Sequence, residues 1–224
     1  MLDVGGGPGR YAITLAEQGY EVSLLDLSEN GLAWARDRAL EAGVTLKATA
    51  RGNAVDLSAF DGQSFDIVLL MGPLYHLVTE EDRTIALEEA TRVLKPGGVL
   101  CASFITRYAP LRDAAKRQPA WILEHADEVE RLLSTGVLYD SGGLFTDAYF
   151  ANQTEVRPLI EPYGFETLDL IAAEGIVGWI EEGVNAASGE LWDAWVRLNY
   201  RLGKDPSVHG VASHLLYVGR KNPV

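Results

Sequence analysis

The stretch LDVGGGPGR at residues 2–10 decides the fold, because it leads from a hydrophobic strand into a helix through four glycines. Gly5, Gly7 and Gly9 carry no side chain at this turn, so a ligand can approach the backbone and the free N–H groups of the following helix. Asp26 closes the next hydrophobic run. A carboxylate in that place can accept hydrogen bonds from both hydroxyls of a ribose. The pattern predicts a nucleoside site.

Two classes of nucleoside ligand fit such a turn, dinucleotides and S-adenosylmethionine. The dinucleotide pattern G-x-G-x-x-G needs a third glycine at position 10, where this chain has Arg10. The pattern here is G-x-G-x-G, which disfavours a dinucleotide. A glycine-rich turn by itself is also compatible with a tight connection that binds nothing.

Short hydrophobic runs alternate with segments of helical periodicity along most of the chain. The pattern predicts strands at 1–5, 21–27, 44–50, 65–71, 98–104, 165–173 and 212–220. It predicts helices at 9–19, 28–43, 80–94 and 154–164, the third with a capping box at Thr79 and Asp82. Repeated β-α units of this kind predict a parallel sheet with helices on both faces.

Two segments, at about 107–152 and 173–209, interrupt this alternation. They include helical patterns at 120–134 and 189–203 and a glycine-containing aromatic passage at 139–150. We interpret both as insertions at the ends of core strands in a single domain over 1–224, where elements that enclose a substrate are expected. Some of their aromatic side chains should cover this substrate. The candidates are Trp121, Phe145, Tyr149, Phe150, Trp179, Trp192, Trp195 and Tyr200.

Composition excludes several classes of function. Acidic residues number 32 against 19 Lys and Arg, a formal charge of −13, which argues against a nucleic-acid partner. The longest apolar run, at 67–78, is too short to span a membrane and is broken by glycine and proline. The single cysteine, Cys101, lies in an apolar run and has no partner for a disulfide. We expect a cytoplasmic protein; the sequence says nothing firm about its oligomeric state.

Five motifs together resemble the class I S-adenosylmethionine-dependent methyltransferases. In order, they are LDVGGGPGRYA at 2–12, LLDLS at 24–28, RGNAVDLSAF at 51–60, FDIVLLMGPLYHL at 65–77 and ATRVLKPGGVLCASF at 90–104. The resemblance implies a Rossmann-like, doubly wound α/β sheet of seven strands, mostly parallel with an antiparallel last strand, plus the helical insertions. It also implies S-adenosylmethionine as cofactor. Family members usually carry helices before the first strand, so the abrupt start at Met1 suggests truncation.

The resemblance assigns candidate cofactor residues position by position. Asp3 and the glycines would surround the methionine end, Asp26 and Leu27 would hold ribose and adenine, and Asn53 would contact the adenine edge. Asn53 stands where family members often have aspartate, and an amide oxygen can still accept a hydrogen bond from the adenine amino group. The complete set is Asp3, Gly5, Gly6, Gly7, Gly9, Asp26, Leu27, Asn53, Ala54 and Met71.

Methyl transfer from a sulfonium needs no metal, because the leaving group is already activated. His125, His209 and His214 show no metal-ligand spacing, and we interpret them as surface or core residues. His76 is the candidate base and Tyr75 a candidate pocket residue, both in the fourth-motif loop. The alternative for each is a structural role.

The leading hypothesis is an enzyme that methylates oxygen, nitrogen or carbon of a small molecule. A non-catalytic module that binds S-adenosylmethionine or S-adenosylhomocysteine is the alternative, and a dehydrogenase is the third. The loop MGPLYH at 71–76 lacks the Asn or Asp followed by Pro-Pro and an aromatic that marks methylation of planar amino groups. Methylation of nucleobases or of glutamine amides is therefore disfavoured.

Overall fold

The computed structural model describes residues 1–139, 145–180 and 182–223. The chain divides into two compact units, each assembled from segments that are separated in the sequence. The first unit contains residues 1–102, 160–168 and 218–224. The second contains residues 103–159 and 169–217.

A parallel sheet forms the centre of the first unit, in the order β3-β2-β1-β4-β5. Leu2 lies beside Ser23 on one side and Val68 on the other. Because the strands are parallel, their carboxyl ends meet at one edge of the sheet, where ligands bind in open α/β folds. The strands are β1 (Leu2–Val4), β2 (Ser23–Asp26), β3 (Ala48–Arg51), β4 (Phe65–Leu70) and β5 (Leu94–Thr106), the last of which ends in the second unit.

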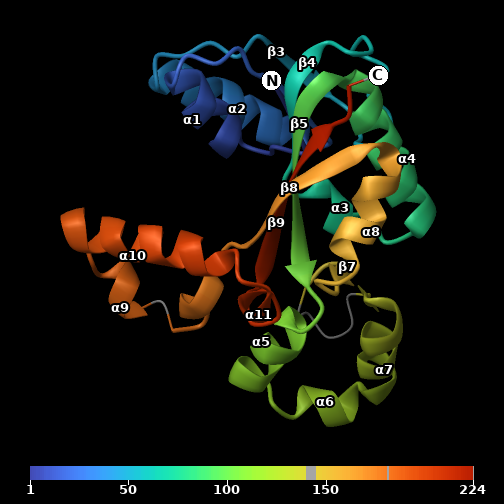
Figure 1. The fold of residues 1–224 in the computed structure, drawn as a ribbon, viewed down its shortest axis with the longest axis vertical. Coiled ribbons are helices and arrows are strands. Elements are labelled where there is room, and N and C mark those ends of the chain that lie inside the picture. Colours follow the sequence, from blue (N-terminus) through green and yellow to red (C-terminus); the bar gives the residue numbers. More distant parts are fainter. Residues whose placement is uncertain (140–144, 181, 224) are drawn as a thin grey trace. The chain divides into compact units, whose positions relative to one another are not determined.

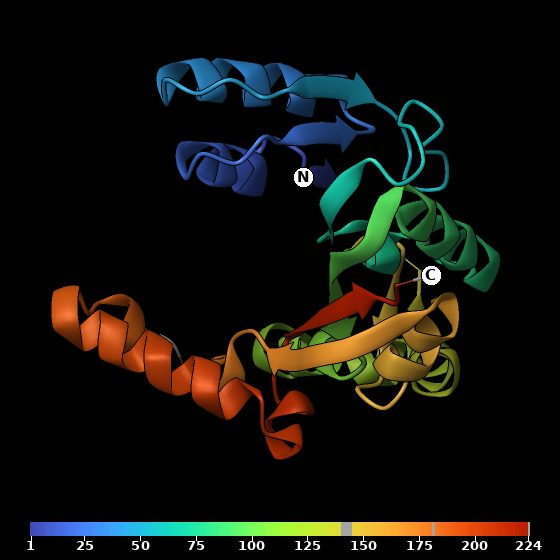
Figure 2. The ribbon, with the colours of Figure 1, turned by 45° about the horizontal axis from the view of Figure 1, so that its top comes forward.

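Helices follow the strands of the first unit in alternation. Figure 2 shows α1 and α2 beside β2 and β3. A cluster of small and branched apolar residues packs these elements together without exposed surface: Ala12, Val22, Leu24, Leu32 and Ala35. The helices are α1 (Arg10–Glu17), α2 (Glu29–Glu41), α3 (Pro73–His76) and α4 (Glu80–Val93).

Both ends of α4 are closed by side chains. Thr79 Oγ1 accepts a hydrogen bond from the Asp82 N–H at 3.1 Å, as the capping box predicts. At the other end, Lys221 Nζ donates to the carbonyl oxygens of Thr91 at 2.7 Å and Leu94 at 2.9 Å. A residue close to the end of the sequence thus satisfies carbonyl groups that a helix leaves without an internal partner.

Beyond β5, the paired strands run in mixed directions. Strand β9 (His214–Lys221) pairs with both β5 and β8 (Phe165–Ala172), and Figure 1 shows β9 running opposite to β5. Strands β6 (Val137–Leu138) and β7 (Ala148–Ala151) pair antiparallel, and β7 also pairs parallel with β5. The chain therefore has a mostly parallel sheet that becomes mixed near its end.

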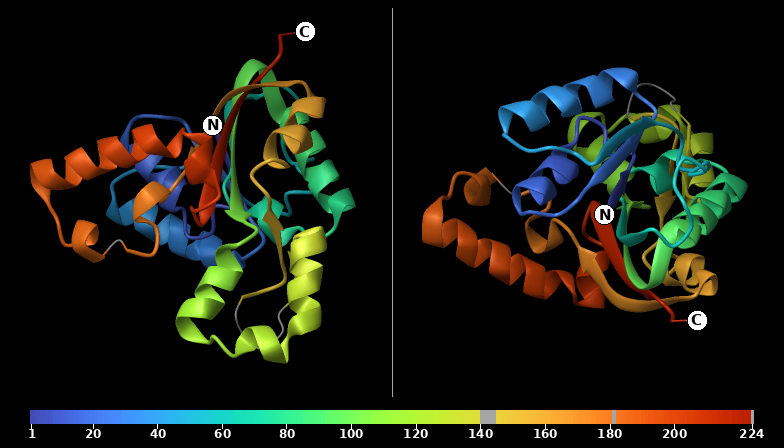
Figure 3. Two further views of the ribbon diagram at one scale, coloured as in Figure 1. Left: turned by 60° about the horizontal axis from the view of Figure 1, so that its bottom comes forward. Right: turned by 90° about the horizontal axis from the view of Figure 1, so that it is seen from above.

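Most helices of the second unit belong to the two segments that interrupt the alternation. Figure 3 shows α5, α6 and α7 following one another in an arc, and α9 beside α10. They are α5 (Ala109–Arg117), α6 (Trp121–Glu124), α7 (Ala126–Thr135), α8 (Val156–Ile160), α9 (Glu182–Asn185), α10 (Gly189–Gly203) and α11 (Pro206–His209). Two short 3-10 turns, η1 (Glu161–Tyr163) and η2 (Gly175–Val177), complete the list.

The fold class predicted from the sequence is confirmed. All seven predicted strands are present, and they correspond to β1 to β5, β8 and β9. The helix predicted at 189–203 is α10, whereas the one predicted at 120–134 is divided at His125 into α6 and α7. The sequence analysis missed β6 and β7, which lie inside the segment 107–152. Of the aromatic passage at 139–150, residues 140–144 lie outside the described residues; the single-domain organisation with substrate-covering insertions stays a prediction.

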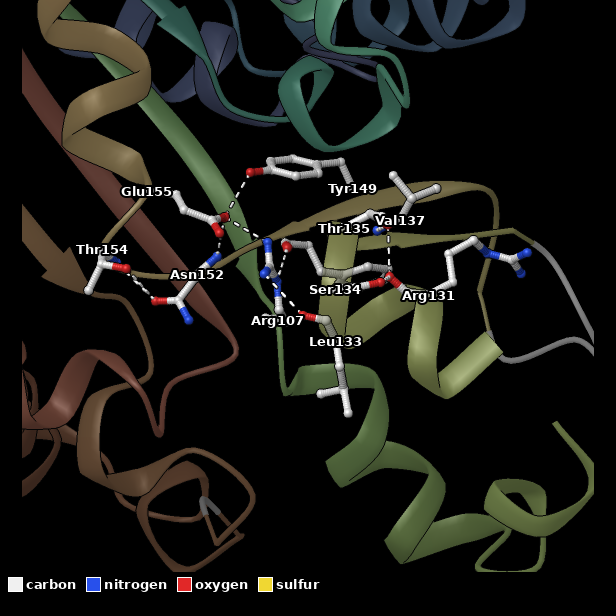
Figure 4. Close-up of polar contacts among 11 residues, drawn as sticks. Arg107, Arg131, Leu133, Ser134, Thr135, Val137, Tyr149, Asn152, Thr154 and Glu155 are labelled. Carbon is white, nitrogen blue, oxygen red and sulfur yellow. Dashed lines mark hydrogen bonds and ion pairs between the residues drawn. The ribbon is translucent and has the colours of Figure 1, made fainter. Parts of the chain in front are cut away.

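An ion pair between a buried arginine and a glutamate whose side chain is 40% exposed joins the end of β5 to the start of α8 in the second unit (Figure 4). Arg107, only 9% of whose side chain is exposed, places Nη2 2.7 Å from Glu155 Oε2. Its Nε donates to the Phe150 carbonyl at 3.2 Å, and the same Glu155 oxygen accepts from the Tyr149 hydroxyl and the Asn152 N–H, both at 3.0 Å. The guanidinium charge is thus compensated where water is largely excluded.

We expect Glu155→Ala to lower the free energy of unfolding by about 2–4 kcal/mol, because it leaves a buried guanidinium without its counter-charge. Glu130→Ala, which removes an exposed carboxylate from α7, is the matched control and should change stability by less than about 0.5 kcal/mol. Urea denaturation followed by circular dichroism measures both. Equal losses in the two variants would contradict the assigned role of the pair.

Candidate functional site

The glycine-rich turn between β1 and α1 uses backbone angles that other residues rarely adopt. Gly5, Gly7 and Gly9 have φ of 70°, 53° and 80°. Gly9 is the N-cap residue of α1 and offers no side chain to the first N–H groups of the helix. The N–H groups of all four glycines are hydrogen-bonded within the protein, so backbone donors for a ligand come from the first turn of α1.

Contacts around the turn explain which of its sides is open. A Cβ at Gly5 would lie 2.7 Å from Pro73 Cγ, so that side is packed against α3. A Cβ at Gly7 would meet only Asp26 Oδ2, at 4.0 Å. The space beside Gly7 and Asp26 is therefore open to a ligand.

Asp26 is held in place by the turn that it faces. Its Oδ2 accepts a hydrogen bond from the Gly7 N–H at 2.7 Å, and its Oδ1 accepts one from the Ser28 N–H at 2.8 Å. A carboxylate has about four lone-pair sites, so each oxygen keeps capacity for one further donor. The arrangement can bind a pair of adjacent hydroxyl groups.

Asp3 lies beside the same turn in a contrasting environment. Its side chain is fully buried, and no hydrogen bond of normal distance and angle reaches either carboxylate oxygen within the described residues. Burial raises the pKa of Asp3 to about 7, the nearby Asp26 carboxylate adds to the rise, and the Ala12 N–H opposes it. An unpaired buried carboxyl group is costly, and a cationic donor would stabilise its ionised form.

The remaining candidate cofactor residues follow β2, β3 and β4. Leu27 is 61% exposed, whereas Ala54 is buried. Asn53 Oδ1 accepts a long hydrogen bond of 3.4 Å from the Val55 N–H, which leaves its other lone pair and its NH₂ group for a ligand. Met71 directly follows β4 and is half-buried. These positions share the carboxyl edge of the parallel strands with the glycine turn.

The fourth-motif loop forms the short helix α3 at the same edge. The Tyr75 hydroxyl donates to the Met71 carbonyl at 3.4 Å, and the Tyr75 and His76 rings lie 4.7 Å apart between centroids. Burial lowers the pKa of His76 and raises that of Tyr75. At neutral pH His76 is therefore uncharged and can accept a proton, while Tyr75 keeps its hydroxyl hydrogen.

The sequence analysis missed a carboxylate–histidine pair in the second unit. His214 Nδ1 lies 2.5 Å from Glu174 Oε1, although 40 residues separate the two in sequence. Both line a cavity of about 630 Å³, together with Trp179, Trp192 and other apolar residues between 171 and 216. No local motif predicts the pair, because the two residues come together only in the folded chain.

The other aromatic and histidine candidates have different places. Trp121, Tyr149 and Phe150 are buried, and Phe145 is 39% exposed. His125 stacks on Trp121, and His209 is buried with Nε2 3.1 Å from the Gly203 carbonyl oxygen.

Among the described residues, no group of three His, Cys, Asp or Glu side chains could hold a metal ion. No helix in the described part of the chain is both long and apolar enough to cross a membrane.

Comparisons with known proteins find similarity to methyltransferases. Residues 2–102 match the family model described as a methyltransferase domain. The chain is 29% identical over 144 residues to the ubiquinone biosynthesis O-methyltransferase of Roseobacter denitrificans, covering 62% of this chain and 56% of that protein. It is 40% identical over 118 residues to the ubiquinone/menaquinone biosynthesis C-methyltransferase UbiE of Ralstonia pickettii, covering 51% and 46%. The chain thus spans about half the length of these curated relatives.

The fold has close structural counterparts. A crystal structure of an S-adenosylmethionine-dependent methyltransferase from Methanosarcina mazei superposes with a TM-score of 0.68 at 20% identity, covering 100% of this chain and 92% of that one. Residues 2–102 are therefore similar to the methyltransferase domain family, and the chain has the fold of S-adenosylmethionine-dependent methyltransferases, a similarity that implies S-adenosylmethionine as the cofactor.

Proposed function

We propose that this protein transfers the methyl group of S-adenosylmethionine to an oxygen, nitrogen or carbon nucleophile of a small molecule. The observation that carries the proposal is Asp26, whose two oxygens are held by the Gly7 and Ser28 N–H groups beside an open space. This arrangement suits a ribose with two free hydroxyls. A cytoplasmic location is part of the same proposal.

The residues present fit S-adenosylmethionine. The buried and unpaired Asp3 carboxyl group suits the ammonium of the methionine end, which would lie along the glycines of the turn. Asp26 and Leu27 would hold the ribose and adenine, and Asn53 and Ala54 the adenine edge. Met71 would contribute from the end of β4. When bound, the sulfonium supplies a methyl group that is already activated for displacement.

The acceptor is proposed to be a small molecule on two grounds. The two relatives above are named for O- and C-methylation in quinone biosynthesis, which makes small acceptors the natural class. The formal charge of −13 disfavours a polyanionic acceptor such as nucleic acid. Analysis of the methylated product would distinguish oxygen, nitrogen and carbon as the acceptor atom.

In the proposed reaction, the chain holds the cofactor, orients the acceptor and removes a proton from it. Fixed backbone donors and the Asp26 carboxylate position the nucleoside, and positioning of this kind accounts for much of the acceleration in a direct displacement. We propose that His76, uncharged at neutral pH, takes the proton of an acceptor that arrives protonated. Tyr75 would line the site as a hydrogen-bond donor.

Replacing Asp26 by alanine should weaken the binding of S-adenosylhomocysteine by about 1–3 kcal/mol, because charge-assisted hydrogen bonds to the ribose are lost. Isothermal titration calorimetry measures the change. Asp37→Ala, an exposed aspartate on α2, is the matched control and should bind as the unaltered protein does. Unchanged affinity in the Asp26 variant would refute the nucleoside site.

Asp3 should make the stability of the free protein fall as the pH rises. Its pKa in the folded state, about 7, exceeds the ordinary value of 3.8, so between these pH values the folded state binds more protons than the unfolded one. The cost approaches 1.4 kcal/mol per pH unit. The Asp3→Asn variant should therefore gain stability relative to the unaltered protein between pH 4 and 8 in urea denaturation, while Asp37→Asn should not. Parallel pH profiles for all three proteins would contradict this assignment.

The His76→Ala variant should bind S-adenosylhomocysteine almost normally but lose a factor of about 10²–10⁴ in turnover, the usual contribution of a general base. Because burial lowers the pKa of His76, the unaltered protein should show an ionisation below pH 6.5 in its rate profile, and the variant should lack it. Release of S-adenosylhomocysteine from a panel of acceptors measures turnover, and His125→Ala is the control. Joint loss of cofactor affinity and thermal stability would mean that His76 is structural.

A further inference from the structure

We propose that the cavity lined by residues between 171 and 216 binds a planar aromatic alcohol, such as a naphthol, whose hydroxyl group donates a hydrogen bond to His214 Nε2. The cavity lies entirely within the second unit. Its volume of about 630 Å³ is typical of sites for small organic molecules. The proposal is independent of methyl transfer, because it involves no residue of the glycine turn.

Glu174 fixes the proton of His214. Its Oε2 accepts hydrogen bonds from the backbone N–H groups of Ser213 at 3.1 Å and His214 at 2.8 Å. Its Oε1 lies 2.5 Å from His214 Nδ1. Burial works to raise the pKa of Glu174, but the hydrogen bonds that it accepts from the His214 side chain and from backbone N–H groups favour its ionised form, and the pKa is lowered. An ionised carboxylate only accepts, so Nδ1 carries the hydrogen.

The other ring nitrogen of His214 is left as an acceptor. With Nδ1 protonated, the Nε2 of a neutral imidazole has a free lone pair. Nε2 makes no hydrogen bond within the described residues, and 44% of the histidine side chain is exposed. His214 Nε2 is thus an oriented acceptor in a cavity that also holds the Asn199 side chain, and it favours a ligand that brings a hydroxyl donor.

The walls of the cavity favour an aromatic body for that ligand. Trp192 is 39% and Tyr200 is 54% exposed, so solvent reaches aromatic surface that a flat ligand would cover. Trp179 has φ of 75°, a conformation that bulky residues rarely adopt, and the Arg112 guanidinium lies 5.1 Å from its ring centroid. The local structure thus holds an indole at the wall despite backbone strain.

Calorimetric titration of the full chain with 2-naphthol and with 2-methoxynaphthalene, without S-adenosylmethionine, tests the proposal. The two compounds share the ring system, but only the first has a hydroxyl donor. We expect 2-naphthol to bind about tenfold more tightly, and the His214→Phe variant to lose that preference while keeping its affinity for the methyl ether. Trp192→Ala should weaken both compounds equally, and Trp34→Ala, an exposed tryptophan of the first unit, should weaken neither.

Three results would overturn the proposal: equal affinity of the unaltered protein for the two compounds, no binding up to their solubility limits, or an undiminished preference in His214→Phe. The comparison on the unaltered protein needs no variant, so it decides even if His214→Phe does not fold. Because the titration omits S-adenosylmethionine, its failure would leave the proposed methyl transfer unaffected.

Discussion

The hydrogen bond from the Gly7 N–H to the Asp26 carboxylate links the end of β2 to the glycine turn after β1. Gly7 makes it with a left-handed φ of 53°, a conformation that glycine adopts at little cost. The parallel pairing of β1 with β2 brings the two groups to the same edge. The sheet register and the glycine conformation therefore act together: a change in either would move the Asp26 carboxylate away from the turn.

Two aspartates near this turn differ in their surroundings. Asp26 is satisfied by two backbone donors, whereas Asp3 is fully buried and no hydrogen bond of normal distance and angle reaches its carboxylate oxygens in the described part of the chain. A Cβ at Gly6 would lie 2.4 Å from Asp3 Oδ2, so the buried carboxyl group is pressed against the turn itself. The first aspartate keeps lone pairs for neutral hydroxyl groups and a positive charge would stabilise the second, as the proposed binding of S-adenosylmethionine requires.

Local patterns sufficed for seven strands, because each is a short apolar run bounded by turn residues. Thr79 and Asp82 predicted the start of α4 for the same reason, since a capping box lies within one helical turn. Strands β6 and β7 could not be predicted, because their pairing with each other and with β5 depends on the fold rather than on a local pattern. The meeting of Glu174 with His214 likewise depends on the placement of β9. The site residues taken from the family resemblance remain predictions.

Lys221 connects the last strand to the carbonyl groups of Thr91 and Leu94, across 130 and 127 residues of sequence. During synthesis, α4 and the start of β5 therefore leave the ribosome long before the group that closes them exists. Contacts of such separation form late and slow the folding reaction, because a long loop must close before they stabilise anything. The first unit consists of segments at 1–102, 160–168 and 218–224. It therefore cannot finish folding during synthesis before nearly the whole chain has been made. Its nascent form must survive with an open sheet edge until almost the whole chain has been made.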